Sequence, residues 1–328
     1  MKKYSRALII FTLGLLTILG LLKIGNIEIS PDTLRRINPA FLAMAVLVHY
    51  SGFVMRGWRW QKVLRGMGHR VSYRYATTLL VSGWFASALL PARLGDVLRA
   101  SLLKRDHGVP LSHGFGSVAT ERTLDIFAIL LLAAVAAVWA LAGRTPAWVW
   151  QTLGGGITLV VALVVGLIAA PQLEGFFTRL LPWQFYRKTV RFGFELLASI
   201  RQLGRNPHLL LTVAGQSLYI WLCDVFLMYF VMLSLGVALP VSIAAFTGMT
   251  VDLAAAVPII PGALGQVEGT ALGVLSLFQI HPDQSSLIIL LNRFISYWTF
   301  IIVSGAVAYF FGFSEAMKSS ELRIANDE

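Results

Sequence analysis

Two stretches of the chain decide its fold: residues 90–97 read LPARLGDV and residues 260–267 read IPGALGQV. Both follow the pattern apolar, Pro, two variable residues, Leu, Gly, polar, Val, and both interrupt a long apolar segment. Proline removes a backbone donor and glycine weakens a helix, so neither segment is expected to be one straight helix. The sequence therefore predicts two helical hairpins, each broken at its proline.

The chain around these stretches has the composition of a membrane protein. Of its 328 residues, 57% are hydrophobic and only 13% are charged, and the mean hydropathy is +0.73. Spanning helices need about 20 apolar residues, and we expect straight spans near 7–22, 37–55, 117–142, 153–171, 209–236 and 285–312. This pattern predicts one all-α, polytopic membrane domain over residues 1–328, with no separate soluble catalytic domain.

The basic residues predict an orientation, because cytoplasmic loops of membrane proteins are enriched in Lys and Arg. The basic start of the chain, residues 1–6, places the N-terminus in the cytoplasm. The cluster after the second helix is expected to be cytoplasmic too: Arg56, Arg59, Lys62, Arg65, Arg70 and Arg74. More basic residues follow at 93–105, so residues 76–103 are predicted to form a re-entrant hairpin from the cytoplasmic side. We expect residues 172–207 to form a basic, aromatic interfacial segment and residues 313–328 a cytoplasmic tail of an inner-membrane protein.

On this topology the second hairpin, residues 240–280, enters from the opposite side, as an inverted repeat requires. Chance similarity between two Pro- and Gly-containing apolar segments is the alternative. Broken helices expose backbone groups that lipid cannot satisfy, so they must line a protein-buried or watery cavity. We therefore expect a substrate site where the two hairpins meet.

Charged residues at membrane depth point to the same place, because each is costly and is usually paired or functional. The candidate substrate-binding residues are Arg93, Asp96, Arg99, Glu121, Arg122, Asp125, Pro261, Gly265, Glu268 and Arg293. Glu121 and Asp125 are expected to share one helix face, near the start of their helix, and Arg293 is expected to open the last helix. Arginine suits a two-pronged grip on phosphate, which indicates an anionic headgroup. Structural ion pairing between hairpins and helices is the alternative, and both interpretations can hold.

Other chemistries lack their motifs. The sequence has no P-loop, G-x-S-x-G or H-E-x-x-H pattern, and its six histidines have no metal-ligand spacing. The single cysteine, Cys223, lies in an apolar run and excludes an intramolecular disulfide. The net charge of +11 is spread over short loops rather than over a basic domain, which argues against nucleic acid. We expect no cofactor and no metal.

Four segments carry a resemblance to a known family: residues 56–60, 90–100, 121–125 and 258–268. Their order and spacing resemble the flippase-like membrane family that includes the transmembrane part of lysylphosphatidylglycerol synthases, over roughly residues 5–312. The resemblance implies a lipid-handling membrane domain, which in the synthase members moves an aminoacylated phospholipid between leaflets. This chain lacks their soluble aminoacyl-transfer domain and has Asp96 where Glu is expected, so the lipid is left open.

These observations predict a translocator that moves an anionic or amphiphilic lipid, either a phospholipid or a polyprenyl-phosphate lipid, between leaflets, and not an enzyme. Two alternatives remain. One is a membrane-embedded transferase acting on a lipid-linked substrate, and the other is a non-catalytic partner of a lipid or glycan synthase. A homo-oligomer is possible in each case.

Overall fold

The computed structural model describes residues 37–89, 94–141, 184–256 and 261–312, with short stretches at 19–20, 23, 147, 149–151, 154–158, 161–162, 165–166, 169 and 172–173. All the regular elements within these ranges are helical. The helices are α3 (Pro39–Gly66), α4 (Tyr73–Leu89), α5 (Leu94–His107), α6 (Leu111–Ala140), α8 (Gln184–Gly204), α9 (Pro207–Ser234), α10 (Val241–Ala255), η2 (Pro261–Ala263), α11 (Gln266–Leu277), α12 (Pro282–Arg293) and η3 (Phe294–Thr299). The predicted all-α, polytopic class is confirmed.

Four helices are long and apolar enough to cross a membrane: Pro39–Gly66, Leu111–Ala140, Pro207–Ser234 and Pro282–Gly312. The last of these comprises α12, the π-helical turn η3 and residues 300–312. They correspond to four of the six expected straight spans, although α3 extends eleven residues beyond the predicted end at residue 55. The expected spans at 7–22 and 153–171 and the tail at 313–328 lie wholly or partly outside the described residues.

The order long, short, short, long occurs twice along the chain. Helices α3 to α6 contain 28, 17, 14 and 30 residues, and α9 to α11 with the final long helix contain 28, 15, 12 and 31. Helices α3 and α9 each start with an Asn–Pro pair in which the asparagine caps the helix. They run antiparallel, because the Asn38 amide at the start of α3 donates to the Ser234 carbonyl at the end of α9 over 2.8 Å.

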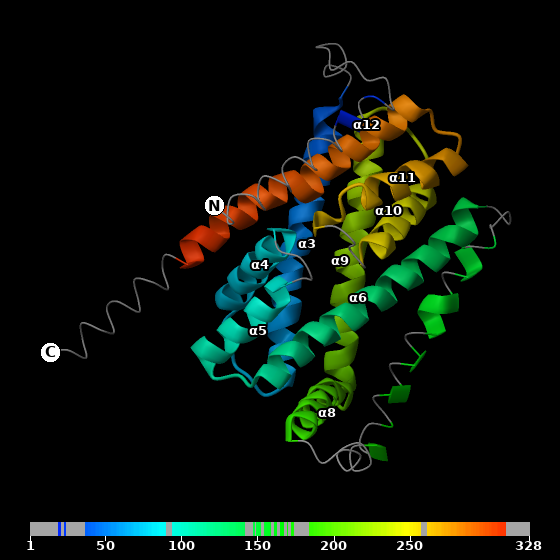
Figure 1. Cartoon of the computed structure of the whole chain (residues 1–328). Coiled ribbons are helices and arrows are strands. Elements are labelled where there is room, and N and C mark those ends of the chain that lie inside the picture. The colour runs from blue at the N-terminus through cyan, green and yellow to red at the C-terminus, as the bar shows by residue number, and fades with distance from the viewer. Residues whose placement is uncertain are drawn as a thin grey trace.

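The two pairs of short helices occupy different ends of this antiparallel core. In Figure 1, α4 and α5 lie beside the lower half of α3, and α10 and α11 lie toward the upper end of the molecule. Helix α4 packs on α3 and α5, and α10 packs on α6, α9 and α11. The breaks predicted at Pro91 and Pro261 fall between the members of each pair, although residues 90–93 and 257–260 are outside the described residues. Re-entry of the hairpins into a membrane stays a prediction.

The close packing of α4 on α5 depends on glycine. A Cβ atom at Gly95 would collide with the Gly83 carbonyl and the Ser87 hydroxyl. The turn of the second pair depends on glycine in another way, since Gly262 and Gly265 have positive φ angles of 70° and 79°, which side-chain-bearing residues rarely adopt.

Helix α8 covers the latter part of the expected interfacial segment, residues 172–207, and packs on α6 and α9. Over residues 191–201, Arg191, Glu195 and Arg201 are exposed, whereas Ser199 is buried and Leu196, Leu197 and Ile200 are partly buried, a mixture of exposed charged and partly buried apolar positions that is expected for an amphipathic helix. Its position at a membrane surface stays a prediction.

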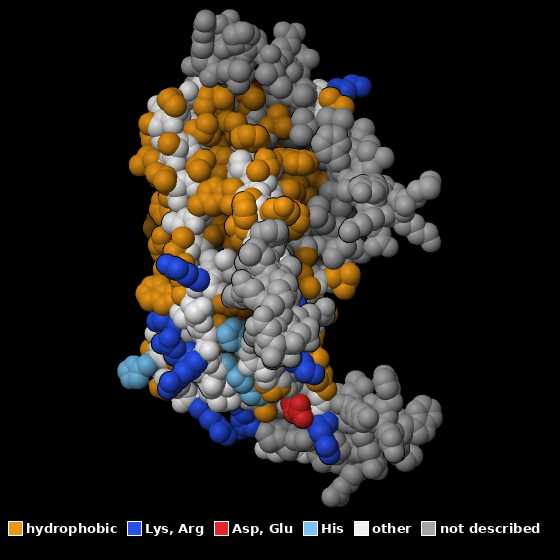
Figure 2. All heavy atoms as spheres, turned by 90° about the vertical axis from the view of Figure 1, so that its left-hand side faces the viewer, with side chains coloured by type: hydrophobic (Ala, Val, Ile, Leu, Met, Phe, Trp, Pro, Cys, Tyr) orange, Lys and Arg blue, Asp and Glu red, His pale blue; other side chains and the backbone are white. Residues whose placement is uncertain are grey.

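One face of the molecule separates apolar from basic surface. In Figure 2 hydrophobic side chains cover the upper part of this face, and Lys and Arg side chains gather over its lower half. The exposed basic side chains at the ends of α3 and α5 and in the intervening turn are Arg65, Arg70, Arg74, Lys104 and Arg105. An apolar band beside a basic end is the surface expected of a membrane domain.

Candidate functional site

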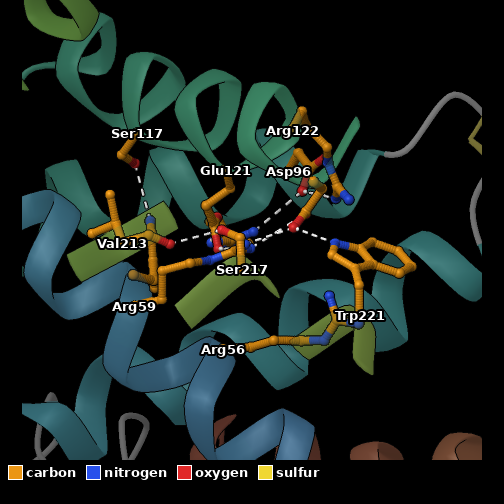
Figure 3. Close-up of polar contacts among 12 residues, drawn as sticks. Arg56, Arg59, Asp96, Ser117, Glu121, Arg122, Val213, Ser217 and Trp221 are labelled. Carbon is orange, nitrogen blue, oxygen red and sulfur yellow. Dashed lines mark hydrogen bonds and ion pairs between the residues drawn. The ribbon is translucent and has the colours of Figure 1, made fainter. Parts of the chain in front are cut away.

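A buried ionic network joins α3, α5 and α6. Glu121 and Asp125 lie one turn apart on the buried face of α6, as the sequence predicted. Arg59 of α3 donates two hydrogen bonds to Asp125, from Nη1 to Oδ1 at 2.6 Å and from Nη2 to Oδ2 at 3.3 Å. Arg99 of α5 donates from Nη2 to Glu121 Oε2 at 2.6 Å. Figure 3 shows these contacts converging between the helices.

Neutral side chains complete the network. The Ser217 hydroxyl accepts from Arg59 Nη1 at 2.7 Å, and Trp221 Nε1 donates to Asp125 Oδ1 at 3.0 Å. The Arg99 guanidinium carbon lies 4.1 Å from the ring centre of Trp60. Buried charges are tolerated when they are paired and hydrogen-bonded, so Arg59, Arg99, Glu121 and Asp125 hold helices together.

Arg122 faces a different side of α6. It donates from Nη2 to both oxygens of Asp96 at 3.3 and 3.4 Å, and its side chain is 31% exposed. Asp96 occupies the first turn of α5, where a carboxylate also favours the helix dipole. The shortest carboxylate bond of Arg122 is 3.3 Å, whereas that of Arg59 is 2.6 Å, and the Arg122 guanidinium lies 5.6 Å from the ring of Trp84. Of these network arginines, Arg122 is the one most open to a further ligand.

A second ion pair lies at the second break. Arg293 donates from Nε to Glu268 Oε1 at 2.6 Å and from Nη2 to the Gly262 carbonyl at 3.0 Å. Glu268 also accepts from the amide of Gly265, the N-cap of α11, at 2.7 Å. Pro261 begins the short helix η2 that precedes this cap. The arginine of the long helix thus holds the backbone of the break and the first turn of the helix that follows it.

The two long central helices are joined by Arg56 and Asp224. Arg56 Nη2 lies 3.0 Å from Asp224 Oδ2, and the Arg56 guanidinium lies 5.0 Å from the rings of both Trp84 and Trp221. Arg56 follows Pro39 by 17 positions, and Asp224 follows Pro207 by 17 positions. Residues at equivalent positions of two related helices meet when they lie near the axis that relates the helices.

A cavity of about 480 Å³ lies between the two pairs of short helices. Its charged and polar lining consists of His49, Arg56, Ser87, Arg122, Asp125, Asp224, Asp252, Asn292, Arg293, Ser296 and Tyr297. Its apolar lining includes Phe53, Trp84, Ile126, Ile129, Trp221, Leu227, Met228, Val251, Val267 and Phe300. The cavity offers guanidinium groups, carboxylates and extended apolar walls together, and its use as a substrate site stays a prediction.

The structure divides the predicted site residues into two groups. One group, at the first pair of short helices, consists of Asp96, Arg99, Glu121, Arg122 and Asp125. The other group, at the second pair, consists of Pro261, Gly265, Glu268 and Arg293. Only Arg122, Asp125 and Arg293 from these groups line the cavity, and Arg93 lies outside the described residues.

Two expectations about position are wrong. Glu121, Arg122 and Asp125 do not open their helix, because α6 begins ten residues before Glu121, at Leu111. Arg293 lies inside the continuous helix 282–312, immediately before its π-helical turn, rather than at its start. Each charge is therefore at the level of the cavity and not at a helix end.

The interpretation of Arg56 and Arg59 as loop residues is also wrong, because α3 continues past both and buries them. A signal for this was in the sequence. The residues at positions 49, 52, 56, 59, 60 and 63 recur at helical spacing and form the buried face of α3. His49, Asp224 and Asp252 were also left out of the predicted site, and no local pattern marks them as neighbours.

Among the described residues, no group of three or more His, Cys, Asp or Glu side chains could hold a metal ion. The donors that line the cavity are guanidinium groups, ring nitrogens, hydroxyls and an amide, and the acceptors are carboxylates. Such a set can bind a charged group by hydrogen bonds and exchange a proton with it.

Comparison with known proteins identifies a matching family and several related sequences. Residues 6–304 match the family model of the lysylphosphatidylglycerol synthase transmembrane region. A UPF0104 membrane protein of Methanothermobacter thermautotrophicus is 24% identical over 331 residues, covering 94% of this chain and 97% of the relative. A UPF0104 membrane protein of Methanocaldococcus jannaschii is 27% identical, over 69% of this chain and 93% of the relative. The glycosyltransferase AglD of Haloferax volcanii is 26% identical over 77% of this chain but only 46% of its own length. No solved structure matches.

Proposed function

Because this chain belongs to the family of the lysylphosphatidylglycerol synthase transmembrane region, we propose that it moves an anionic or amphiphilic lipid between membrane leaflets. The observation that carries the proposal is the cavity of about 480 Å³ between the two pairs of short helices. Its volume is within the range of about 300–1,000 Å³ typical of small-molecule sites, which is enough for a lipid headgroup.

The lining of the cavity suits the two parts of a lipid. Arg122 and Arg293 approach it from α6 and α12, and Arg56 approaches it from α3. Guanidinium groups bind phosphate oxygens through paired hydrogen bonds. Ile126, Ile129, Leu227 and Val251 provide apolar wall beside them, where the start of an acyl or prenyl chain can lie.

The arginines already have carboxylate partners, so a phosphate must compete with those partners. Arg122 has the longer bonds, an unpartnered Nε and a partly exposed side chain. It is therefore the first contact we assign to the headgroup. Arg93 is expected near the same hairpin from its sequence position, and its role stays a prediction.

The repeated order of helices supports an inverted repeat, in which the two hairpins approach from opposite membrane faces. Antiparallel α3 and α9 have the relation that such a repeat requires, and Arg56 pairs with Asp224 at the equivalent position of the partner helix. Transport would then alternate access to the cavity between the two hairpins. The basic lower surface in Figure 2 supports a cytoplasmic position for this end of the molecule, and we propose an inner-membrane protein with both termini in the cytoplasm.

The test is lipid transfer by the purified protein in liposomes. Acyl-labelled fluorescent phosphatidylglycerol is the probe, and a membrane-impermeant quencher reports how much of it reaches the outer leaflet. We expect transfer by the wild-type chain and its loss in an Arg122→Gln, Arg293→Gln double variant. The matched control changes two exposed arginines, Arg65→Gln with Arg105→Gln, and should transfer lipid normally. Unimpaired transfer by the cavity variant would refute this site, and no transfer by the wild-type chain would refute translocation of this lipid class.

A second candidate is a membrane transferase that acts on a lipid-linked sugar. The similarity to AglD, which is named a glycosyltransferase, favours it. The chain matches less than half of that protein, however, so the likeness does not place a transferase activity in the matched part. Turnover of a polyprenyl-phosphate sugar by the purified chain, dependent on a cavity carboxylate such as Asp252, would favour the transferase over the translocator.

A further inference from the structure

The buried charges of the membrane region can be matched pair by pair. Five arginines bind five carboxylates: Arg56 with Asp224, Arg59 with Asp125, Arg99 with Glu121, Arg122 with Asp96, and Arg293 with Glu268. Asp252 of α10 is the remaining carboxylate that lines the cavity, and it makes no hydrogen bond or ion pair with a described residue. An uncompensated carboxylate at this depth is costly unless a cation or a proton neutralises it.

Both negatively and positively charged groups surround Asp252. Asp252 interacts electrostatically with Asp224, Arg56 and Arg293. Because Asp224 and Glu268 already bind Arg56 and Arg293, these arginines do not offset Asp252 in full. From the elements packed around α10, the other titratable or charged groups that line the same cavity are Arg122 and Asp125 of α6, His49 of α3 and Tyr297 of η3.

His49 is the second observation that points to a bound proton. Its side chain is 6% exposed, it lines the cavity, and neither ring nitrogen has a hydrogen-bond partner. Its Nδ1 lies 3.7 Å from Asp224 Oδ1, beyond hydrogen-bond length. A neutral imidazole is an acceptor and a donor at once, and a protonated one offers two donors. A buried imidazole with no hydrogen-bond partner on either nitrogen, close to Asp224 and in the same cavity as Asp252, leaves unused hydrogen-bonding capacity at this place.

We propose that Asp252, Asp224 and His49 form a proton-binding site in the cavity, with the proton on Asp252 when no substrate is bound. One proton makes the two carboxylates and Arg56 together electrically neutral, because Arg56 offsets one of the two carboxylates. Entry of a phosphate headgroup would change the field at this site through Arg56 and Arg293. The coupling of proton release to lipid movement rests on the proposed translocation, whereas the proton site itself does not.

A proton fits this site better than a metal cation. Hard cations such as Mg²⁺ and Ca²⁺ require six or more oxygen ligands, largely carboxylates, carbonyls and water. Here one carboxylate is already bound to Arg56 at 3.0 Å, and a positive guanidinium borders the place that a cation would occupy. Asp252 is therefore the residue that carries the proton, and Asp224 is a positioning residue.

The direct test is infrared difference spectroscopy of the full chain in liposomes between alkaline and acidic buffer. A buried protonated carboxyl has a C=O stretching band that is separate from the bands of carboxylates. We expect Asp252→Asn to abolish one such band. The matched control is Asp283→Asn, which changes an exposed carboxylate paired with His281 at 2.6 Å and should leave the band in place. A band that persists in Asp252→Asn would overturn the proposal.

A second variant, His49→Gln, tests the proposal in case Asp252→Asn does not fold. His49→Gln removes a group that can become positive beside the carboxylates, so the Asp252 band should persist to higher pH than in the wild type. A band with unchanged pH dependence in this variant would remove His49 from the site. Elution of each variant as a single species in size-exclusion chromatography is required before its spectrum is compared.

Liposomes with an imposed pH gradient separate the two proposals. Lipid transfer that responds to the gradient in the wild type, and no longer responds in Asp252→Asn, supports coupling. An Asp252-dependent band in a protein that transfers no lipid supports the proton site and refutes translocation. Transfer by a protein without this band refutes the proton site and leaves translocation standing.

Discussion

The half of the molecule formed by α3 to α6 and the half formed by α9 to η3 repeat one order of helices but hold their charges differently. In the ionic networks described above, the first half contributes four arginines and three carboxylates: Arg56, Arg59, Arg99 and Arg122 with Asp96, Glu121 and Asp125. The second half has one arginine for three carboxylates: Arg293 with Asp224, Asp252 and Glu268. The excess arginine of the first half, Arg56, binds Asp224 of the second.

This difference suggests that the two halves have different roles. The first half is tied by hydrogen bonds from α3 and α5 to the same face of α6 (Figure 3). The second half depends on one arginine, and its long helix is interrupted by a π-helical turn directly after that arginine, a feature frequent at functional sites. We expect the first half to serve as the rigid frame and the second half as the part that moves.

The largest expected effect comes from replacing Arg59, which lies in the ionic network of the first half. Arg59→Met leaves Asp125 buried without its arginine partner, so we expect the free energy of unfolding in mixed micelles to fall by about 3–5 kcal/mol. Arg65→Met, an exposed arginine two turns along the same helix, is the control and should change little. A loss below about 1 kcal/mol would mean that the network is not a frame.

A smaller loss is expected from the second half. Arg293→Met removes the arginine partner of Glu268, but Glu268 keeps its hydrogen bond from the Gly265 amide. We expect the unfolding free energy to fall by about 2 kcal/mol, measured as for Arg59→Met. A loss equal to that of Arg59→Met would remove the distinction between frame and moving half.

An added methyl group on a short helix should also destabilise the first half more than the second. Gly95→Ala forces a methyl group against the Gly83 carbonyl, so we expect a loss of about 1–3 kcal/mol. In the second half, Gly269 of α11 has nothing within 4 Å of an added Cβ, and Gly269→Ala should stabilise the protein by about 0.5–1 kcal/mol through helix propensity. Unfolding of both variants in the same detergent checks the pair, and destabilisation by Gly269→Ala would contradict an open α11.

The smallest effect is a local sensitivity to acid. His69, in the turn after α3, shares a 2.8 Å hydrogen bond between its Nε2 and His113 Nδ1. Burial, and then the proximity of His113, lowers the pKa of His69 below its usual 6.5. The folded state therefore binds fewer protons than the unfolded state just below pH 6.5, so stability is full above that pH and falls as pH decreases toward the folded pKa. The turn after α9, residues 235–240, has no ionisable side chain.

Thermal unfolding at about pH 7.5 and about pH 5.5 measures this effect. The loss of stability at the lower pH should be smaller in His69→Gln than in the wild type. His208→Gln, which changes an exposed histidine at the start of α9, should behave as the wild type does. Equal acid sensitivity of the wild type and His69→Gln would show that the histidine pair does not report on the first half.

Much of the fold follows from local pattern. Apolar runs of spanning length predicted α3, α6, α9 and the final helix, and proline with glycine predicted the two breaks. The site followed only in part. Glu121 and Asp125 were found because residues four apart share a helix face, and Arg122 and Arg293 because they are costly in a membrane. Arg56 and Arg59 were misassigned because a scan for charge-free runs ends a helix at its first arginine, whichever way that side chain points.

The sequence by itself determined that the chain is a helical membrane protein, because lipid constrains hydropathy and backbone satisfaction locally. Only the tertiary structure decided which charges match. Arg56 and Asp224 are 168 residues apart in sequence, and Asp252 is recognised as the cavity carboxylate without a partner among the described residues only after each arginine has been assigned to its own. Pairing depends on distances between helices, and no spacing along one helix contains that information.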